Sequence, residues 1–176
     1  FQLKRFKDLI NNDLANTIGN MINRTVSMSR KWFHNCTPIL KSNNIENCLA
    51  VKSIKTIKTV RSSLSNTSFN EACQSILLLS REANLYLNDN SPWSMIKDPS
   101  QVEDVAQIIY NVLETSRLVG LLLKPILPDL SIKILKQLSI NDNIEIWGDS
   151  LVWGLLQQGL ELSEPIPIID RIEIDI

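Results

Sequence analysis

Apolar residues recur every three or four positions through most of the first 140 residues, which is the spacing of one face of an α-helix. The first run predicts a long helix from about Leu3 to Phe33, ended by Thr37-Pro38. Its apolar stripe consists of Leu14, Ile18, Met21, Thr25, Met28 and Trp32. A second stripe at the same steps is polar and consists of Asp13, Asn16, Asn20, Arg24, Ser27 and Lys31. This helix therefore has one face for a core and one face for solvent or a polar ligand.

The same spacing predicts four further helices. They cover about residues 45–64, 69–88 and 99–123, and a shorter stretch from Asp129 or Ser131 to about Leu138. Ser68 and Glu71 have the spacing of a capping box, in which each side chain bonds the backbone N–H of the other residue. Residues 118–123 are almost all apolar, so we expect them at the centre of the molecule. The predicted fold class is all-α, a bundle of about five helices.

The helical spacing stops after Asn141. Glycines interrupt the apolar residues, residues 164–167 have the composition of extended chain, and residues 172–176 alternate as in a half-buried strand. We therefore divide the chain into a helical bundle over 1–140 and an irregular, partly extended C-terminal tail over 141–176. An isolated strand is not stable, so we expect the tail to pack back on the bundle or on a missing part of a longer protein. The chain has no initiator Met and begins within a helical pattern, which favours a fragment.

Composition narrows the functional classes. With 44% hydrophobic and 21% charged residues, the chain resembles an ordinary soluble globular protein. No apolar run approaches the roughly 18 residues of a membrane span, so we expect no membrane partner and a cytoplasmic location. Three scattered cysteines and the single histidine, His34, predict reduced thiols and no metal site. No nucleophile–base pair or Gly-rich phosphate loop is present, so we expect no catalytic residue in this chain.

Charge is divided unevenly along the chain. Residues 1–88 carry twelve Lys or Arg against five Asp or Glu, a net +7, and residues 89–176 carry six against fourteen, a net −8. The whole chain has a formal net charge of −1. Such asymmetry favours a basic first half that faces a negatively charged partner.

Two features of the sequence are candidates for ligand binding. Amides and guanidinium groups, as on the polar stripe, offer fixed hydrogen-bonding atoms that suit base edges and phosphates, although surface helices also carry polar stripes. Pro92 disfavours helical geometry at Ser91, so Trp93 lies at or just past a helix end, where it either joins the core or stacks on a base. An oblique basic band on the second predicted helix suits either solvent or phosphate, and it consists of Lys52, Lys55, Lys58 and Arg61.

Four segments in order carry a resemblance to a known family. They are the run N-x-D-L-A-N-x-x-G-N-x-x-N-R over 11–24, Asn84-Leu85-Tyr86 followed by Ser91-Pro92-Trp93, the turn over 123–128, and Arg171-Ile172-Glu173. Together they resemble the C-terminal anticodon-binding domain of methionyl-tRNA synthetases, which are class I aminoacyl-tRNA synthetases. In that family an N-terminal catalytic domain uses ATP and Mg²⁺ to attach methionine to tRNA. Its HIGH and KMSKS motifs are absent here, so the fragment is expected to be inactive alone.

The resemblance also implies a binding site. It predicts that the bundle reads the anticodon CAU of methionine tRNA and contacts the catalytic domain of the same protein. Asn20, Arg24 and Trp93 match the family's anticodon readers, with Trp93 stacking the first base and Asn20 and Arg24 bonding that base or its neighbour. Pro92 is expected to position Trp93. Further supporting candidates are Asn16, Asn23 and Asn88.

Two alternatives and two departures accompany this hypothesis. The chain could instead be the anticodon domain of a sibling synthetase, for leucine, isoleucine, valine or cysteine, or a helical protein–protein interaction module. Ile169-Asp170 stands before Arg171 where family members often carry Phe-Pro. Arg81 occupies a position where some members carry an acid, so its role is unassigned.

Overall fold

The computed structural model describes residues 2–41, 47–141 and 149–173, and it confirms the all-α prediction. The first helical run consists of α1 (Leu3–Asp8), η1 (Leu9–Gly19) and α2 (Asn20–Trp32). The remaining elements are α3 (Cys48–Ser65), α4 (Phe69–Asn90), α5 (Pro92–Met95), η2 (Pro99–Gln101), α6 (Val102–Leu123), α7 (Pro128–Gln137) and η3 (Asp149–Leu151). The described residues contain no strand, only an isolated bridge between Cys36 and Glu161. Among them, no helix is long and apolar enough to cross a membrane.

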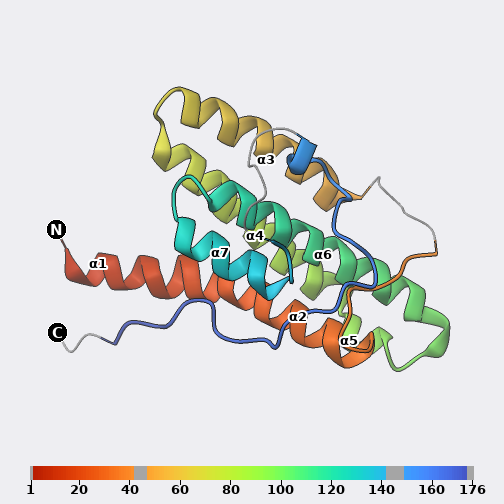
Figure 1. Cartoon of the computed structure of the whole chain (residues 1–176). Helices are drawn as coiled ribbons and strands as arrows, with labels where there is room; N and C mark the ends of the chain where they lie inside the picture. The colour runs from red at the N-terminus through yellow and green to blue at the C-terminus, as the bar shows by residue number, and fades with distance from the viewer. Residues whose placement is uncertain (1, 42–46, 142–148, 174–176) are drawn as a thin grey trace.

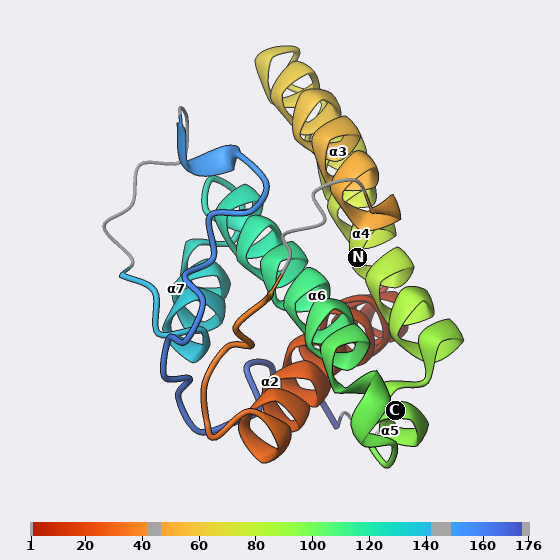
Figure 2. The same cartoon turned by 90° about the vertical axis from the view of Figure 1, so that its right-hand side faces the viewer.

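Helix α6 forms the centre of the bundle, with α2, α3, α4 and α7 packed around it (Figures 1 and 2). Residues 108–123 are all buried, which confirms the central position predicted for 118–123. Gly120 allows α7 to approach closely, because a Cβ at this position would lie 2.9 Å from Cγ2 of Ile134. The apolar composition of α6 therefore decides which helix the others surround.

The spacing predicted one long α-helix from about Leu3 to Phe33. The observed run is continuous, but its middle part is not a regular α-helix. Residues of η1 have π-helical winding, in which hydrogen bonds span five residues rather than four. The buried face of the run also differs from the predicted stripe and consists of Ile18, Met21, Ile22, Thr25, Val26 and Ser29. Leu14, Met28 and Trp32 are only half-buried.

Several predicted helix starts differ from the structure. The α3 helix begins at Cys48, where Oδ1 of Asn47 accepts the N–H of Ala50 at 2.9 Å; the predicted start at Ile45 lies outside the described residues. The capping box at Ser68 is wrong, because the Ser68 side chain makes no capping hydrogen bond to α4. The α7 helix starts at Pro128 without a side-chain cap, so neither Asp129 nor Ser131 has the predicted role.

A buried ion pair on α6 holds the start of the tail. Arg117 donates to Glu114 through Nε at 2.7 Å and through Nη2 at 2.6 Å. The Glu114 carboxylate also accepts the backbone N–H groups of residues 154–156, and Arg117 donates to the carbonyls of Ser150 and Val152. Tyr110 donates to the carbonyl of Leu156 at 2.8 Å, and burial raises the pKa of its phenol to about 12. We did not predict this network.

The rest of the tail returns along the first helical run in the opposite direction (Figure 1). Thr37 donates through Oγ1 to the carbonyl of Gln157 at 2.7 Å and accepts the N–H of Leu160 at 2.9 Å. Further along, the amide of Asn11 donates to the carbonyl of Ile172 at 3.1 Å and accepts its N–H at 2.9 Å. The Asn11 side chain therefore holds Ile172, and neither residue 172 nor residue 173 lies in the predicted strand. Residues 174–176 of that strand, and Trp147, lie outside the described residues.

Candidate nucleic-acid interface

Trp93 lies where α4 ends and α5 begins. Ser91 at this corner has a left-handed backbone (φ 45°, ψ 53°), which is uncommon for a residue other than glycine. Its hydroxyl donates to the carbonyl of Asn88 at 2.8 Å, and buried Pro92 opens the short helix α5. The corner leaves 39% of Trp93 exposed. The indole is thus presented at the surface on a rigid turn rather than in the core.

Arg24 connects Trp93 to two helices. Its Nη2 donates to Oδ1 of Asn88 at 3.2 Å, and its Cζ lies 5.5 Å from the centroid of the Trp93 ring. A guanidinium at this distance from an indole makes a cation–π interaction, which contributes about 0.5–1 kcal/mol at an exposed site. Residues from α2, α4 and α5 therefore meet at one point, and three of the seven predicted site residues, Arg24, Asn88 and Trp93, are in contact.

The three predicted asparagines on the first helical run have different surroundings. Asn20 and Asn23 are exposed, and neither side chain makes a hydrogen bond within the described part of the chain. Asn16 is engaged, because its Oδ1 accepts from Nη2 of Arg171 at 2.6 Å and its Nδ2 donates to Oδ1 of Asn12 at 3.3 Å. Asn20 and Asn23 are thus available to a ligand, whereas Asn16 helps to hold the tail.

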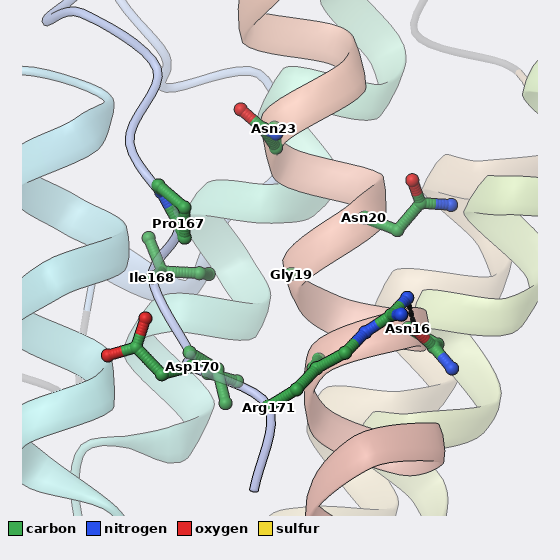
Figure 3. Close-up of a pocket in the computed structure, with 10 residues that line it drawn as sticks. Asn16, Gly19, Asn20, Asn23, Pro167, Ile168, Asp170 and Arg171 are labelled. Atoms are coloured by element: carbon green, nitrogen blue, oxygen red, sulfur yellow. Dashed lines mark hydrogen bonds between the residues drawn. The ribbon is translucent and has the colours of Figure 1, made fainter. Parts of the chain in front are cut away.

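A cleft of about 660 Å³ lies where this helix face meets the tail, and we call it the helix–tail cleft. Its residues are Ala15, Asn16, Gly19, Asn20 and Asn23 on one side and residues 167–171 on the other. In Figure 3, Asn23 and Pro167 lie towards one end, and the paired Asn16 and Arg171 lie towards the other. A second cleft of the same volume lies between residues 33–41 and the start of α6.

The polar stripe is not wholly a ligand-binding face. Asp13, its first member, pairs with Arg81 of α4 at 2.6 Å, so this part of the stripe joins two helices. The contact gives Arg81 the role that the sequence left unassigned. Arg171 at the cleft was not among the predicted site residues, because spacing carries no signal for a contact across 155 residues. The Asn16 amide, which the pattern did single out, is its partner.

These features describe an all-α nucleic-acid-recognition domain, in which an exposed indole, a guanidinium and free amides share one face. The chain belongs to the family described as the anticodon binding domain of methionyl tRNA ligase, which matches residues 40–175. This membership confirms the family resemblance of the four segments.

Individual relatives agree with the family assignment. A methionine–tRNA ligase of a Nostoc species is 34% identical to this chain, and the match covers 98% of this chain and 34% of that relative. A methionine–tRNA ligase of Bacillus anthracis is 32% identical, and the match covers 100% of this chain and 27% of that relative. The structure of apo Mycobacterium tuberculosis methionyl-tRNA synthetase superimposes with a TM-score of 0.90 at 24% identity, over 99% of this chain and 36% of that one. The chain thus spans about a third of the length of the relatives it matches.

Proposed function

We propose that this domain reads the CAU anticodon of methionine tRNA for a methionine–tRNA ligase whose catalytic domain lies in the same protein. The observation that carries the proposal is the meeting of Arg24, Asn88 and Trp93 beside the free amide of Asn20. Bases of a single-stranded loop can be splayed out, stacked on an aromatic ring and hydrogen-bonded along their edges. The attachment of methionine, with its ATP and Mg²⁺, belongs in this proposal to the rest of the protein. A cytoplasmic location stays a prediction.

The proposal gives each residue a chemical task. Trp93 stacks the first anticodon base, which contributes about 1–3 kcal/mol per base. Arg24 covers one side of the indole in the free protein, and Asn88 limits the directions in which its guanidinium can turn. Asn20 lies one helical turn before Arg24 and bonds the same base or its neighbour. Pro92 keeps the turn rigid, so the indole is presented before RNA arrives.

The first prediction concerns Trp93 itself. In the full-length protein, Trp93→Ala should weaken binding of a CAU anticodon stem-loop by about 1–3 kcal/mol and remove most of its preference over a loop with the first base changed. Fluorescence anisotropy with labelled stem-loops measures both quantities. Phe69→Ala, which removes another exposed aromatic ring from the far end of α4, should change neither.

Other outcomes point elsewhere. An unchanged first-base preference in Trp93→Ala contradicts the stacking role. Tighter binding of a leucine, isoleucine, valine or cysteine anticodon stem-loop favours a sibling specificity. Absence of any RNA binding by the folded full-length protein contradicts the function as a whole and leaves a protein–protein module as the better hypothesis.

A further inference from the structure

We propose that Asn84 of α4 is a positioning residue for anticodon recognition, which acts by holding the end of η1 and so placing Arg24 against Trp93. This inference rests on the proposed function and explains how one of its readers is oriented. Nδ2 of Asn84 donates to the carbonyl of Thr17 at 2.9 Å. The contact joins α4 to the first helical run across 67 residues of the chain.

The surroundings of the Asn84 amide fix the direction in which it points. Nδ2 lies within hydrogen-bonding distance of two carbonyl oxygens, that of Thr17 at 2.9 Å and that of Ser80 at 3.1 Å. Only the NH₂ group of an amide can donate to a carbonyl, so the nitrogen must occupy this place. Oδ1 is buried without a hydrogen-bond partner among the described residues, which costs free energy. The amide is thus used only as a donor, and its bond to Thr17 is the one that reaches another helix.

The Thr17 carbonyl lies where the winding of the first helical run changes. The π-helical segment η1 ends at Gly19, and α2 begins at Asn20. Backbone hydrogen bonds span five residues in π winding and four in α winding, so the bonding ladder is irregular where the two meet. Side chains that bond into the ladder at such a point change the direction of a helix. Asn84 therefore controls how α2 leaves η1.

A change of rotation at this junction is passed on to Arg24. An α-helix turns by about 100° per residue, so a shift of one residue in the bonding ladder would rotate Arg24 away from α4. The contacts of Arg24 itself are an exposed hydrogen bond to Asn88 at 3.2 Å and the cation–π contact with Trp93, and both are weak at a surface. Because α4 packs mainly against η1 rather than against α2, the placement of Arg24 depends on the contact between α4 and η1.

Helix α4 carries both Asn84 and the corner that presents the indole. Trp93 follows the end of α4 after the left-handed turn at Ser91. A second contact, the ion pair of Asp13 with Arg81 at 2.6 Å, joins η1 to α4 about one turn before Asn84, but it is partly exposed and therefore contributes little. By holding η1 on α4, the Asn84 amide sets the distance between a reader on α2 and a ring held by α4.

The first test measures the placement of Arg24 without RNA. Asn84→Asp keeps the shape of the side chain but puts a carboxylate, which cannot donate, against the two carbonyls. Asn84→Leu removes the donor without adding a charge and is the second variant. In the full-length protein with isotope-labelled arginine, the ring current of Trp93 displaces the NMR signal of the Arg24 Nε–H, and Trp93→Ala gives its undisplaced position. We expect either Asn84 variant to move the signal towards that position.

The second test measures the preference of the full-length protein for a CAU stem-loop over one with the first base changed. Arg24→Ala and Asn84→Leu should each lower this preference about three- to tenfold. The double variant should lose no more than Arg24→Ala alone, because Asn84 acts through Arg24. Val60→Ala is the control for stability, since it leaves a cavity on α3, which packs against α4 and α6, and it should not change the preference.

The outcomes separate this inference from the function on which it rests. An Arg24 signal that stays in place in a folded Asn84 variant overturns the inference, whatever the RNA affinities are. Additive losses in the double variant also overturn it, since Asn84 would then affect the preference independently of Arg24. If the signal moves but the wild-type protein has no first-base preference, the proposed function fails, although Asn84 still places Arg24.

Discussion

Two glycines in helices show how the same residue type can have opposite consequences. Gly120 lies where α6 meets α7, and a Cβ there would lie 2.9 Å from Cγ2 and 3.4 Å from Cβ of Ile134. Gly19 faces the cleft, where a Cβ would make ordinary contacts at 3.6 and 3.8 Å. A glycine in the middle of a helix is explained either by close packing against another element or by room for a ligand. Helix packing of this kind occurs instead at Gly120.

We predict that Gly120→Ala lowers the free energy of unfolding by about 1–3 kcal/mol, because an extra carbon in a packed core forces its neighbours apart. Gly19→Ala should raise it by up to about 1 kcal/mol, since alanine loses less backbone entropy in a helix. Urea unfolding of the two variants measures both changes. If Gly120→Ala raised the free energy of unfolding as much as Gly19→Ala does, the packing at Gly120 would be looser than these distances indicate.

At the scale of elements, α6 both fills the core and anchors the tail. Glu114 and Arg117 are almost completely buried, yet their hydrogen bonds go to each other and to backbone groups of residues 150–156. Burying two charges costs free energy that only close pairing and full hydrogen bonding offset. The pair therefore specifies where the chain after residue 149 must lie, and the tail that forms one side of the helix–tail cleft follows from that point.

We predict that Glu114→Gln destabilises the folded state by about 3–5 kcal/mol, because it leaves the buried Arg117 without a counter-charge. Glu82→Gln in the more exposed Lys52–Glu82 pair should cost at most about 1 kcal/mol. Urea unfolding gives the free energies, and limited proteolysis reports whether the tail is released first. A loss below 1 kcal/mol in Glu114→Gln would contradict the anchoring role of this ion pair.

For the whole molecule, the uneven charge decides how strongly salt affects RNA binding. The first 88 residues carry a net +7 and include Arg24 and Lys31 on the α2 face. The basic band of α3 belongs to a helix that packs against α4 and α6, away from the α2 face (Figures 1 and 2). Few cations therefore lie close to the bases, and most of the specificity must come from stacking and hydrogen bonds.

We predict that the affinity for a CAU stem-loop falls only modestly as the salt concentration rises. The slope of the logarithm of the association constant against the logarithm of the salt concentration should be about −1 to −2, because two or three phosphate contacts to a single strand give a slope of this size. A titration between low and physiological salt measures the slope, and Lys31→Ala should make it shallower. A slope near zero would argue for a protein partner. A much steeper slope would bring the α3 band into the interface.

Sequence pattern alone determined the main helical elements, their approximate ends and the central position of α6, because helical spacing and a nearly continuous apolar run are local features of a chain. The family resemblance, rather than the pattern, singled out Arg24, Asn88 and Trp93 as candidates, and the structure brings them into contact although Arg24 and Asn88 are 64 residues apart. Helix caps were predicted poorly, since Ser68 has the right residue type but not the capping bond.

Only the tertiary structure decided the path of the tail and, with it, the existence of the helix–tail cleft. The contacts that define this path join Thr37 to Gln157, Asn16 to Arg171 and Asn11 to Ile172, between 120 and 161 residues apart. No periodicity can encode such pairs, because each depends on where the packed bundle has already placed both partners. The polar helix face was therefore predictable from the sequence, whereas the cleft beside it arises from folding.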